Sequence, residues 1–453
     1  MNQSEIKHVL NDKGVNPSKK LGQNFLTDTN VSKWIVDQLL PTADDVVVEV
    51  GPGTGALTEH VVGRVRHVIL VEFDARLAEY QQQKYEGRED VEVHHCDGAR
   101  FDTNLLLKYG PVKFLGNLPY SSGGAIMRNF MKKPSNIERA VLMLQKEFID
   151  RIVSPPRLKT YGVLSLRMQS EWESQPVKTV PPEAFHPRPI IDSTVMVCKP
   201  LAAGTFPNYD LRLFDELIRR GFAQRRKQVR KQMPDSPVWE EVAASMGIAE
   251  TTRAEELSVE QWIELTRRYD DSPLKDIPQR ADEVFDVVDE KDQVVRQETR
   301  ATVHAENLLH RAVHILVFNK YKEVFIQKRS LLKDTHPGAW DSSAAGHLDS
   351  GETYTACALR ELEEELGVEL DEEDIQELAQ LKPSKNTGWE FIHLYLARWD
   401  GQLRYPCSEI ETGVWIKLEE LGEWVAARPE DFATGFLECW KAFKEKNNTS
   451  NEA

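Results

Sequence analysis

Apolar residues in the first half of the chain gather in short runs that alternate with polar, helix-forming stretches. The runs cover Val46–Val50, 65–72, 91–97, Val112–Asn117 and 140–144. Short apolar runs bounded by glycine and polar residues predict buried strands, and their alternation with helices predicts a parallel sheet covered on both faces. From Phe214 to about Tyr269 the apolar spacing is that of helices. We therefore predict a doubly wound α/β domain, followed by a small helical appendix.

The second half has a different pattern, in which strand-like runs surround a single helical stretch. The runs cover Val284–Val288, 312–318, 323–328 and 391–398, and the helical stretch covers Tyr354–Leu366. This arrangement predicts an α+β domain. Residues 270–280 are polar and contain two prolines, as linkers do. We expect the α/β domain at 1–205, the helical appendix at 206–269, the linker at 270–280 and the α+β domain at 281–445.

Charge is distributed unevenly between these halves. Residues 1–272 contain 36 basic and 37 acidic side chains, whereas residues 273–453 contain 21 and 36. The net charge of −16 therefore resides mainly in the second half and does not exclude a nucleic-acid partner for the first. No apolar stretch reaches the roughly 18 residues that a membrane span needs, and no secretory signal is visible. The five scattered cysteines fit a reducing compartment, so we expect a cytoplasmic protein.

Three predicted strands end in residues that suit a nucleotide-containing cofactor. The first runs into a Gly-Pro-Gly-Thr-Gly segment at 51–55, and the next two end at Glu72 and Asp97. Glycines such as Gly51 and Gly53 let a backbone turn tightly and approach a cofactor closely. An acid at Glu72 can accept hydrogen bonds from ribose hydroxyls, and Asp97 can accept a hydrogen from an adenine amine. The glycines also fit a loose dinucleotide pattern, so NAD stays a candidate cofactor at this point.

A fourth predicted strand ends in Asn117-Leu118-Pro119-Tyr120. The Asn117 side-chain oxygen and a neighbouring backbone carbonyl can accept the two hydrogens of an exocyclic amine, and the Tyr120 ring can stack on a planar base. Proline stiffens the corner and removes a competing donor. An ordinary strand-to-loop turn also uses such residues, so the corner alone does not decide between the two interpretations.

Residues from about 19 to 231 resemble the small-subunit ribosomal RNA adenine dimethyltransferases, which use S-adenosylmethionine. The matching stretches are Leu21-Gly22-Gln23-Asn24-Phe25-Leu26, 49–55, Glu72, Asp97, 117–120, 145–147, 161–165 and 185–193. The resemblance implies a Rossmann-like class I methyltransferase that modifies N6 of two adjacent adenosines near the 3′ end of small-subunit rRNA. It implies that the methyl donor is bound by Asn24, Leu26, Gly51, Gly53, Glu72, Asp97 and Asn117.

The same resemblance implies that Tyr120 and Phe185 sandwich the target adenine. The family continues after the tyrosine with Asn-Ile, whereas Ser121 and Ser122 follow here. The tetrad at 117–120 is therefore complete, and the residues around the bound base differ from the family pattern.

The chemistry of adenine methylation agrees with this tetrad. The N6 lone pair is delocalised into the ring and is a poor nucleophile. When Asn117 Oδ1 and the Leu118 carbonyl accept its two hydrogens, the nitrogen can pyramidalise toward the donor methyl, and in-line positioning supplies most of the acceleration. No strong general base is required. An NAD-dependent reaction explains neither the tetrad nor Phe185.

Residues 219–231 hold seven basic side chains and no acid. A run of one sign is commonly a solvated face. Next to an adenine-type site this run favours contacts with RNA phosphates, and its composition predicts a helix. The Gln-Arg-Arg-Lys segment at 224–227 also matches the dimethyltransferase pattern. We assign RNA binding to Arg225, Arg226, Lys227, Arg230 and Lys231.

Between Gly346 and Val368 the second half reads Gly-x5-Glu-x7-Arg-Glu-Leu-x-Glu-Glu-x-Gly-Val. Glu361, Glu364 and Glu365 lie at i, i+3 and i+4 and share one face of the predicted helix. A glutamate run is commonly a solvated face, but three clustered carboxylates also suit a hard cation such as Mg²⁺. Such a site polarises a diphosphate and activates water.

This pattern is a complete Nudix box, and the second half resembles the Nudix hydrolases. The resemblance implies a Mg²⁺-dependent hydrolase of a diphosphate-containing small molecule, with the three glutamates as metal ligands. It also implies that Arg360 braces Glu352 and that Glu409 adds a carboxylate. The segments 310–314 and 340–347 are similar to the branch related to isopentenyl-diphosphate isomerase. Ala345 replaces the catalytic cysteine of the isomerases, which favours hydrolysis.

Alternative functions remain for both halves. The first could methylate large-subunit rRNA, or it could be a non-catalytic assembly factor that binds the pre-30S particle. The helical appendix with its basic run favours the small subunit as the substrate. The second could act as an isomerase or as a binding module.

Overall fold

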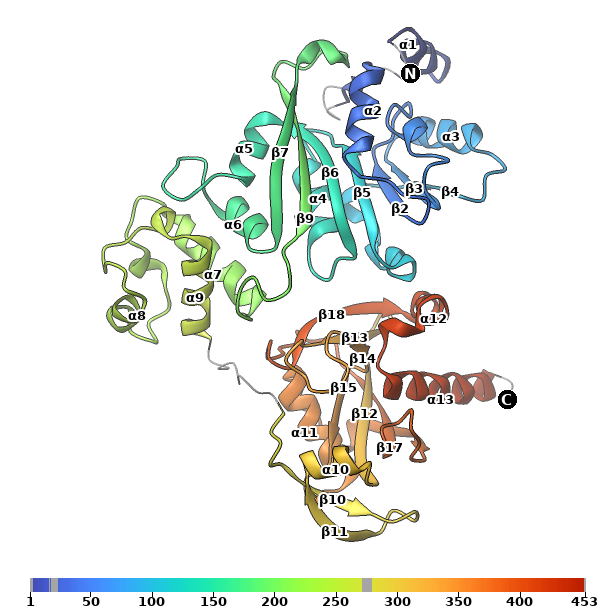
Figure 1. Cartoon of the computed structure of the whole chain (residues 1–453), viewed down its shortest axis with the longest axis vertical. Coiled ribbons are helices and arrows are strands. Elements are labelled where there is room, and N and C mark those ends of the chain that lie inside the picture. The colour runs from blue at the N-terminus through green and yellow to red at the C-terminus, as the bar shows by residue number, and fades with distance from the viewer. Residues whose placement is uncertain (1–2, 16, 18–22, 271–278, 452–453) are drawn as a thin grey trace. The chain divides into compact units, whose positions relative to one another are not determined.

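The structure is a computed structural model that describes residues 3–15, 17, 23–270 and 279–451. The chain divides into two compact units, residues 1–270 and 271–453, and each is described by itself (Figure 1). Residues 271–278 of the predicted linker lie outside the described residues, as do Leu21 and Gly22 of the first matching stretch.

Seven strands form the central sheet of the first unit, in the order β4-β3-β2-β5-β6-β9-β7. They are β2 (Val46–Val50), β3 (His67–Glu72), β4 (Val91–His95), β5 (Val112–Asn117), β6 (Ile137–Gln145), β7 (Trp172–Val180) and β9 (Ser193–Pro200). The strands from β4 to β6 are parallel, whereas β9 is antiparallel to both β6 and β7. The five predicted strands are confirmed. The antiparallel edge was not predicted, because most side chains of β7 are polar and lie outside the core.

Apolar side chains of the central strands alternate between two cores. Val46, Val48 and Val50 of β2 belong to one core, and Val47 belongs to the other. Helices α4 (Gly123–Met131) and α5 (Lys146–Ile152) contribute to the first core, and α2 (Thr29–Asp37) contributes to the second. A parallel sheet that is buried on both faces is doubly wound, so the predicted α/β class is confirmed.

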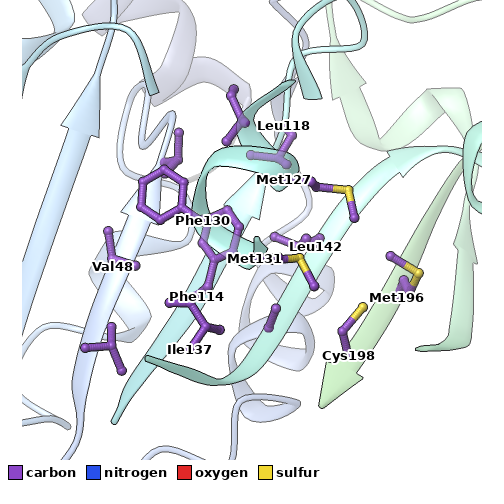
Figure 2. Close-up of a cluster of buried hydrophobic side chains, with 14 of the residues drawn as sticks. Val48, Phe114, Leu118, Met127, Phe130, Met131, Ile137, Leu142, Met196 and Cys198 are labelled. Atoms are coloured by element: carbon purple, nitrogen blue, oxygen red, sulfur yellow. The ribbon is translucent and has the colours of Figure 1, made fainter. Parts of the chain in front are cut away.

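Figure 2 shows the first core next to the end of β5. Phe114 of β5 stacks on Phe130 of α4, with ring centroids 4.8 Å apart. Leu118, the residue after β5, is 1% exposed and belongs to the same core as Met127. Full burial of a leucine side chain contributes about 2 kcal/mol. This core therefore anchors the segment that begins at the strand end.

The helical appendix forms a third core. It contains α7 (Leu211–Ala223), α8 (Trp239–Met246) and α9 (Val259–Tyr269), around the fully buried Trp262. A Cβ atom at Gly221 would lie 2.4 Å from the Trp262 ring, so only glycine fits where α7 meets this tryptophan. Tyr161 and Leu166 belong to the same core, although they precede the appendix in the sequence. The helical prediction is confirmed, and the exact boundary at 205/206 stays a prediction.

The basic run at 219–231 is not one helix, which corrects the sequence-based prediction. Helix α7 ends at Ala223, and a short 3-10 helix at Val229–Gln232 follows after an irregular stretch. The chain leaves the helix at Gln224, whose φ of −132° and ψ of 65° lie outside the α region. The basic side chains are therefore spread over a helix end and a loop.

The remaining elements of the first unit are α1 (Gln3–Asp12), β1 (Phe25–Leu26), α3 (Ala75–Lys84), α6 (Val163–Gln169) and β8 (Phe185–His186). Strands β1 and β8 pair antiparallel and bring Leu26 opposite Phe185. This short pairing joins two segments that are far apart in the sequence.

The second unit is built on a mixed sheet in the order β14-β13-β12-β17-β16, with β15 paired to β12 and β18 paired to β13. The strands are β12 (His310–Phe318), β13 (Glu323–Arg329), β14 (Trp340–Asp341), β15 (Ala344–His347), β16 (Ile375–Leu381), β17 (Glu390–Arg398) and β18 (Ile410–Lys417). Only β12 and β17 pair in parallel among these described strands. The predicted α+β class is confirmed.

Helix α11 (Tyr354–Leu366) has the predicted bounds. The Thr353 side chain caps its first turn by accepting from the Ala356 amide, and Gly367 ends it with a φ of 64°. Leu362 and Leu366 pack into the core of the unit, and the residues that precede them, Glu361 and Glu365, are also buried.

The remaining elements of this unit are β10 (Val284–Val288), β11 (Val294–Thr299), α10 (Arg300–Glu306), α12 (Leu418–Ala427) and α13 (Thr434–Asn451). Strands β10 and β11 form a separate antiparallel hairpin. Among the helices of both units, as far as they are described, none is long and apolar enough to cross a membrane.

Two candidate catalytic centres

A pocket opens in the first unit where β2, β3 and β5 end. Parallel strands place their carboxyl ends at one edge of a sheet, which is where such folds bind ligands. The predicted residues that line this pocket are Asn24, Leu26, Gly51, Gly53, Glu72, Asp97, Asn117, Leu118, Pro119 and Tyr120. The structure thus brings together every predicted residue of this site except Phe185.

The glycine segment lines the pocket in a backbone conformation that glycine favours. Gly51 and Gly53 have φ values of 73° and 57°, and a Cβ atom at Gly53 would lie 3.0 Å from the Phe25 ring. Glu72 accepts from the amides of Gly53 and Asp74, each at 2.9 Å. The Glu72 carboxylate therefore holds the glycine segment against the end of β3, in addition to facing the pocket.

Asn117 lies at the end of β5 with its amide orientation fixed. Its Nδ2 donates to the backbone carbonyl of Asn24 at 3.0 Å. A carbonyl only accepts, so the NH2 end of the side chain must point toward Asn24. The pocket contains both residues, and Oδ1 is left to accept hydrogen bonds from a ligand.

The segment after Asn117 is held at both ends. The Leu118 amide donates to the Met143 carbonyl of β6 at 3.1 Å, and the Gly123 amide donates to the Pro119 carbonyl at 2.8 Å. A Cβ atom at Gly123 would lie 2.4 Å from the Leu144 side chain, so a larger residue here would displace Leu144 where α4 begins. The corner is therefore a stiff connection from β5 into α4.

Tyr120 is fixed by a hydrogen bond that the sequence did not predict. Its hydroxyl lies 2.6 Å from Ser193 Oγ at the start of β9. Ser193 is fully buried, and burial raises the pKa of the Tyr120 hydroxyl, so the phenol stays neutral at physiological pH. The sequence signal was available, since Ser193 ends the matching stretch 185–193, but nothing in it indicated the partner.

Phe185 is not among the residues that line the pocket. Its side chain is 2% exposed and belongs to the second core of the sheet, opposite Leu26 in the β1–β8 pair. Leu26, its partner in that pair, is equally buried and lines the pocket. The role of Phe185 in stacking on the base therefore stays a prediction.

Two further residues that line the pocket were not predicted from the sequence as parts of the site. Phe73 follows Glu72, lines the pocket and is 56% exposed, although it is a large apolar side chain. Thr54 of the glycine segment also lines the pocket, and its buried Oγ1 has no hydrogen-bond partner within the described part of the chain. An exposed aromatic ring and an unsatisfied hydroxyl are what a pocket for an aromatic, polar ligand presents.

The five predicted RNA-binding residues differ in their surroundings. Arg225 is half-buried and donates to Glu255 and to the carbonyls of Leu158 and Lys159, so it holds the appendix to the rest of the unit. Arg230 lies 3.6 Å from Glu240. The other three, Arg226, Lys227 and Lys231, are exposed.

In the second unit, α11 presents the three predicted glutamates on one face. Glu361 and Glu365 are 8% and 5% exposed, whereas the Glu364 side chain is 63% exposed. A Cβ atom at Gly346 would lie 2.0 Å from Glu361 Oε1, so glycine at this position makes room for the carboxylate.

Arg360 and Lys333 balance the charge of these carboxylates. Arg360 donates to Glu352 at 3.0 Å and to Glu361 at 2.7 Å, which confirms that it braces Glu352. Lys333 is buried and contacts both Glu365, at 3.5 Å, and Glu409. The predicted carboxylate Glu409 therefore lies in the cluster, and the lysine between the two acids was not predicted.

The donor set fits a hard divalent cation. Burial raises the pKa of Glu361 to about 8, and the nearby Glu365 carboxylate adds to the effect. The pKa of Glu365 is also raised, first by burial, although Lys333 opposes the shift. A raised pKa means that the ionised form of these crowded, buried carboxylates is disfavoured unless positive charge lies nearby. A bound cation supplies that charge, and oxygen ligands suit Mg²⁺.

Comparison with known proteins assigns both units. The sequence profile of the family "Ribosomal RNA adenine dimethylase" matches residues 14–271, and that of the "NUDIX domain" matches residues 308–434. The Ribosomal RNA small subunit methyltransferase A of Shewanella pealeana is 36% identical over 254 residues, which is 56% of this chain and 95% of that protein.

Two solved structures show similarity to one unit each. A dimethyladenosine transferase from Plasmodium falciparum is 21% identical, covers 53% of this chain and 95% of its own, and has a TM-score of 0.46. A MutT protein from Methanosarcina mazei Go1 is 19% identical, covers 30% of this chain and 93% of its own, and has a TM-score of 0.26. The sequence profiles, together with the Shewanella relative, are decisive: the chain belongs to the ribosomal RNA adenine dimethylase family and also carries a Nudix hydrolase domain.

Proposed function

We propose that the first unit transfers methyl groups from S-adenosylmethionine to N6 of adenosines in small-subunit rRNA, two adjacent ones near its 3′ end. The observation that carries the proposal is the fixed orientation of Asn117, whose Oδ1 is left to accept an amine hydrogen in the pocket. The family of the chain and the name of its Shewanella relative support the choice of substrate.

Each pocket residue then has a defined task. S-adenosylmethionine, when bound, supplies an electrophilic methyl group. Asn24, Leu26, Gly51, Gly53, Glu72 and Asp97 hold the donor, with the Glu72 carboxylate toward its hydroxyls and Asp97 toward its adenine amine. Asn117 Oδ1 and the Leu118 carbonyl accept the two hydrogens of the target amine. Accepting both hydrogens localises the nitrogen lone pair, and fixed acceptors need no reorganisation during the reaction.

The target base stacks on Tyr120, whose ring is held by Ser193. Pro119 keeps the segment between acceptor and ring stiff. In this proposal Phe185 supports the pocket from the core, because its backbone pairs with Leu26, which lines the donor site.

The exposed basic side chains of the first unit bind RNA phosphates. Direct contacts with phosphates are made by Arg226, Lys227 and Lys231. Arg230, which lies near Glu240 in the RNA-free protein, leaves that carboxylate and contacts a phosphate when RNA binds. Arg225 acts as a positioning residue, since its guanidinium is occupied by Glu255 and two backbone carbonyls.

The second unit hydrolyses a diphosphate-containing small molecule with Mg²⁺. Glu361, Glu364 and Glu365 hold the metal, which when bound polarises the diphosphate and lowers the pKa of water. Lys333 and Arg360 offset the charge of the carboxylates. The resemblance to isopentenyl-diphosphate isomerase does not extend to its chemistry: Ala345 stands in the cysteine position, and Cys357 is fully buried with its thiol directed to the His347 carbonyl.

Incubation with labelled S-adenosylmethionine and either small or large ribosomal subunits, both under-methylated, tests the methyl-transfer proposal. Label in the small-subunit RNA alone is expected. Label in large-subunit RNA would favour the alternative substrate, and no label in either would favour a non-catalytic assembly factor.

A panel of diphosphates tests the second activity. Glu364→Gln removes one ligand that lies at the surface, so the fold should survive, and Mg²⁺-dependent phosphate release should fall by at least about 100-fold. Unchanged release would remove Glu364 from the metal site. Conversion of a diphosphate to its isomer, with no release of phosphate, would favour the isomerase alternative.

A further inference from the structure

A loop of the first unit, between α5 and α6, carries two exposed basic side chains that lie outside the basic run at 219–231. The loop covers residues 153–162 and contains no acid. Arg157, Leu158 and Lys159 in its middle are all exposed, the leucine to 51%. Neither basic side chain forms an ion pair or a hydrogen bond with the described residues. Two unpaired cations therefore flank an exposed apolar side chain.

The appendix holds this loop by its backbone. The Arg157 amide donates to the Glu255 carbonyl at 2.7 Å. The Arg225 guanidinium donates to the next two carbonyls of the loop, those of Leu158 and Lys159. The same guanidinium pairs with the Glu255 carboxylate, so the negative charge next to the loop is offset. The loop is thus fixed in place without the use of its own basic side chains.

Arg157 has a backbone conformation that glycine favours. Its φ is 73°, in the left-handed region where a residue with a Cβ atom is disfavoured. Within the described part of the chain, no hydrogen bond or ion pair of its side chain compensates for this strain. Backbone strain at an exposed, charged residue is typical of a side chain that contacts a ligand.

We infer that Arg157 and Lys159 bind phosphates of the RNA substrate. Their loop forms one surface with the exposed side chains of Arg226 and Lys227, because Arg225, the residue before them, holds the loop. Unpaired cations neutralise phosphates, and the exposed leucine between the two loop cations offers an apolar contact to a ribose or a base. The inference rests on the proposed RNA substrate, and it extends the contacts from the appendix to the α/β domain.

Helix α5 connects this loop to the site of the target base. The helix begins at Lys146, whose amide donates to the Asp192 carbonyl at 3.1 Å. The next residue, Ser193, holds the Tyr120 hydroxyl. The helix has seven residues, so the loop follows about 10 Å farther along the helix axis. Phosphate contacts fix the register of a nucleic acid, so contacts at the loop position the target adenosine relative to Tyr120.

Equilibrium binding of the full-length protein to under-methylated small ribosomal subunits, measured over a range of salt concentrations, tests the inference. Arg157→Gly removes the side chain and adopts a φ of 73° without strain, so the fold should not be weakened. We expect about tenfold weaker binding and a slope of log K against log salt that is smaller by about 1. Lys159→Gln should have the same two effects, and Arg157→Lys should keep the wild-type slope because it keeps the charge.

Lys322→Gly is the matched control. Lys322 is an exposed basic residue of the second unit with a φ of 62°, so its replacement makes the same change of backbone and charge outside the proposed surface. This variant should bind the subunits with the affinity and the salt slope of the wild type. Urea denaturation should show that neither glycine variant is less stable than the wild type. If Arg157→Gly is less stable, Lys159→Gln decides the outcome.

The outcomes separate this inference from the proposed function. Methylation of the small subunit by the wild type, together with wild-type affinity and slope in Arg157→Gly and Lys159→Gln, would overturn the inference alone. Weaker binding with an unchanged slope would also overturn it, because the loop would then contact a ribosomal protein rather than phosphates. A wild-type protein that neither binds nor methylates the small subunit would overturn the proposed function itself.

Discussion

The side-chain amide of Asn117 donates to the backbone carbonyl of Asn24 at 3.0 Å. This bond joins the end of β5 to a segment 93 residues earlier in the chain and decides which end of the Asn117 side chain faces the pocket. An asparagine without such a partner could present either its oxygen or its NH2 group, and only the oxygen can accept an amine hydrogen.

Asn117→Asp tests this orientation. The aspartate keeps an acceptor of the same size but cannot donate to the Asn24 carbonyl, so its carboxylate is repelled from that position. We expect methyl transfer to fall by about 100-fold or more, by analogy with the loss of one preorganised hydrogen bond in an active site. Single-turnover rates at saturating donor measure the effect, with the exposed Asn208→Ala as control. A rate within a few-fold of wild type would contradict the assigned orientation.

Ser193→Ala tests whether Ser193 acts through Tyr120. One hydrogen bond contributes about 1 kcal/mol, so kcat/KM should fall roughly fivefold. Tyr120→Phe removes the same bond from its other end. The double variant should then cost no more than either single variant, because both remove one interaction. Additive losses would show that Ser193 has a separate role.

The salt dependence of RNA binding separates the basic residues into two groups. Alanine at Arg226, Lys227 or Lys231 should reduce the slope of log K against log salt by about 1 for each phosphate that the variant no longer neutralises. Arg225→Ala should instead lower the free energy of unfolding by about 1–3 kcal/mol, since it leaves Glu255 and two carbonyls without their donor. Lys441→Ala, exposed in the second unit, is the control and should change neither quantity.

Stability of the metal-free protein should depend on pH through Glu361. Burial raises its pKa in the folded state from 4.5 to about 8, so between these values the folded chain holds a proton that the unfolded chain has released. The contribution of this residue to the free energy of unfolding is therefore complete below pH 4.5 and falls as the pH rises toward 8. Urea denaturation in chelator should show wild type losing stability relative to Glu361→Gln across this range. Parallel pH profiles of the two proteins would contradict the raised pKa.

Most of the first fold could be predicted because its central strands are buried on both faces. β5 and α11 have the bounds that their apolar spacing indicates. β5 ends at Asn117, just before the proline corner, and α11 ends just before Gly367. β7 escaped prediction because it is an edge strand with mainly polar side chains, whose place is set by pairing with β9. The basic run was given a helix because composition does not reveal the break at Gln224.

The site residues could be predicted where they belong to short local motifs, and not where two distant segments meet. Glu72 is the last residue of β3 and Asp97 lies two residues after β4, so the order of strands placed both at the sheet edge. The bonds of Asn117 to Asn24 and of Tyr120 to Ser193 join residues 93 and 73 positions apart, which no local pattern encodes. The burial of Phe185 beside Leu26 likewise comes from the pairing of two distant segments. The cytoplasmic location stays a prediction.

The central claim is that the pocket around Asn117 methylates adenine in small-subunit rRNA. Mass spectrometry of rRNA from under-methylated small subunits, incubated with the full-length protein and S-adenosylmethionine, tests it most directly. The account predicts N6,N6-dimethyladenosine at two adjacent positions near the 3′ end with the wild type, and none above background with Asn117→Ala. Absence of dimethyladenosine with the wild-type protein, or an equal amount with Asn117→Ala, would contradict it.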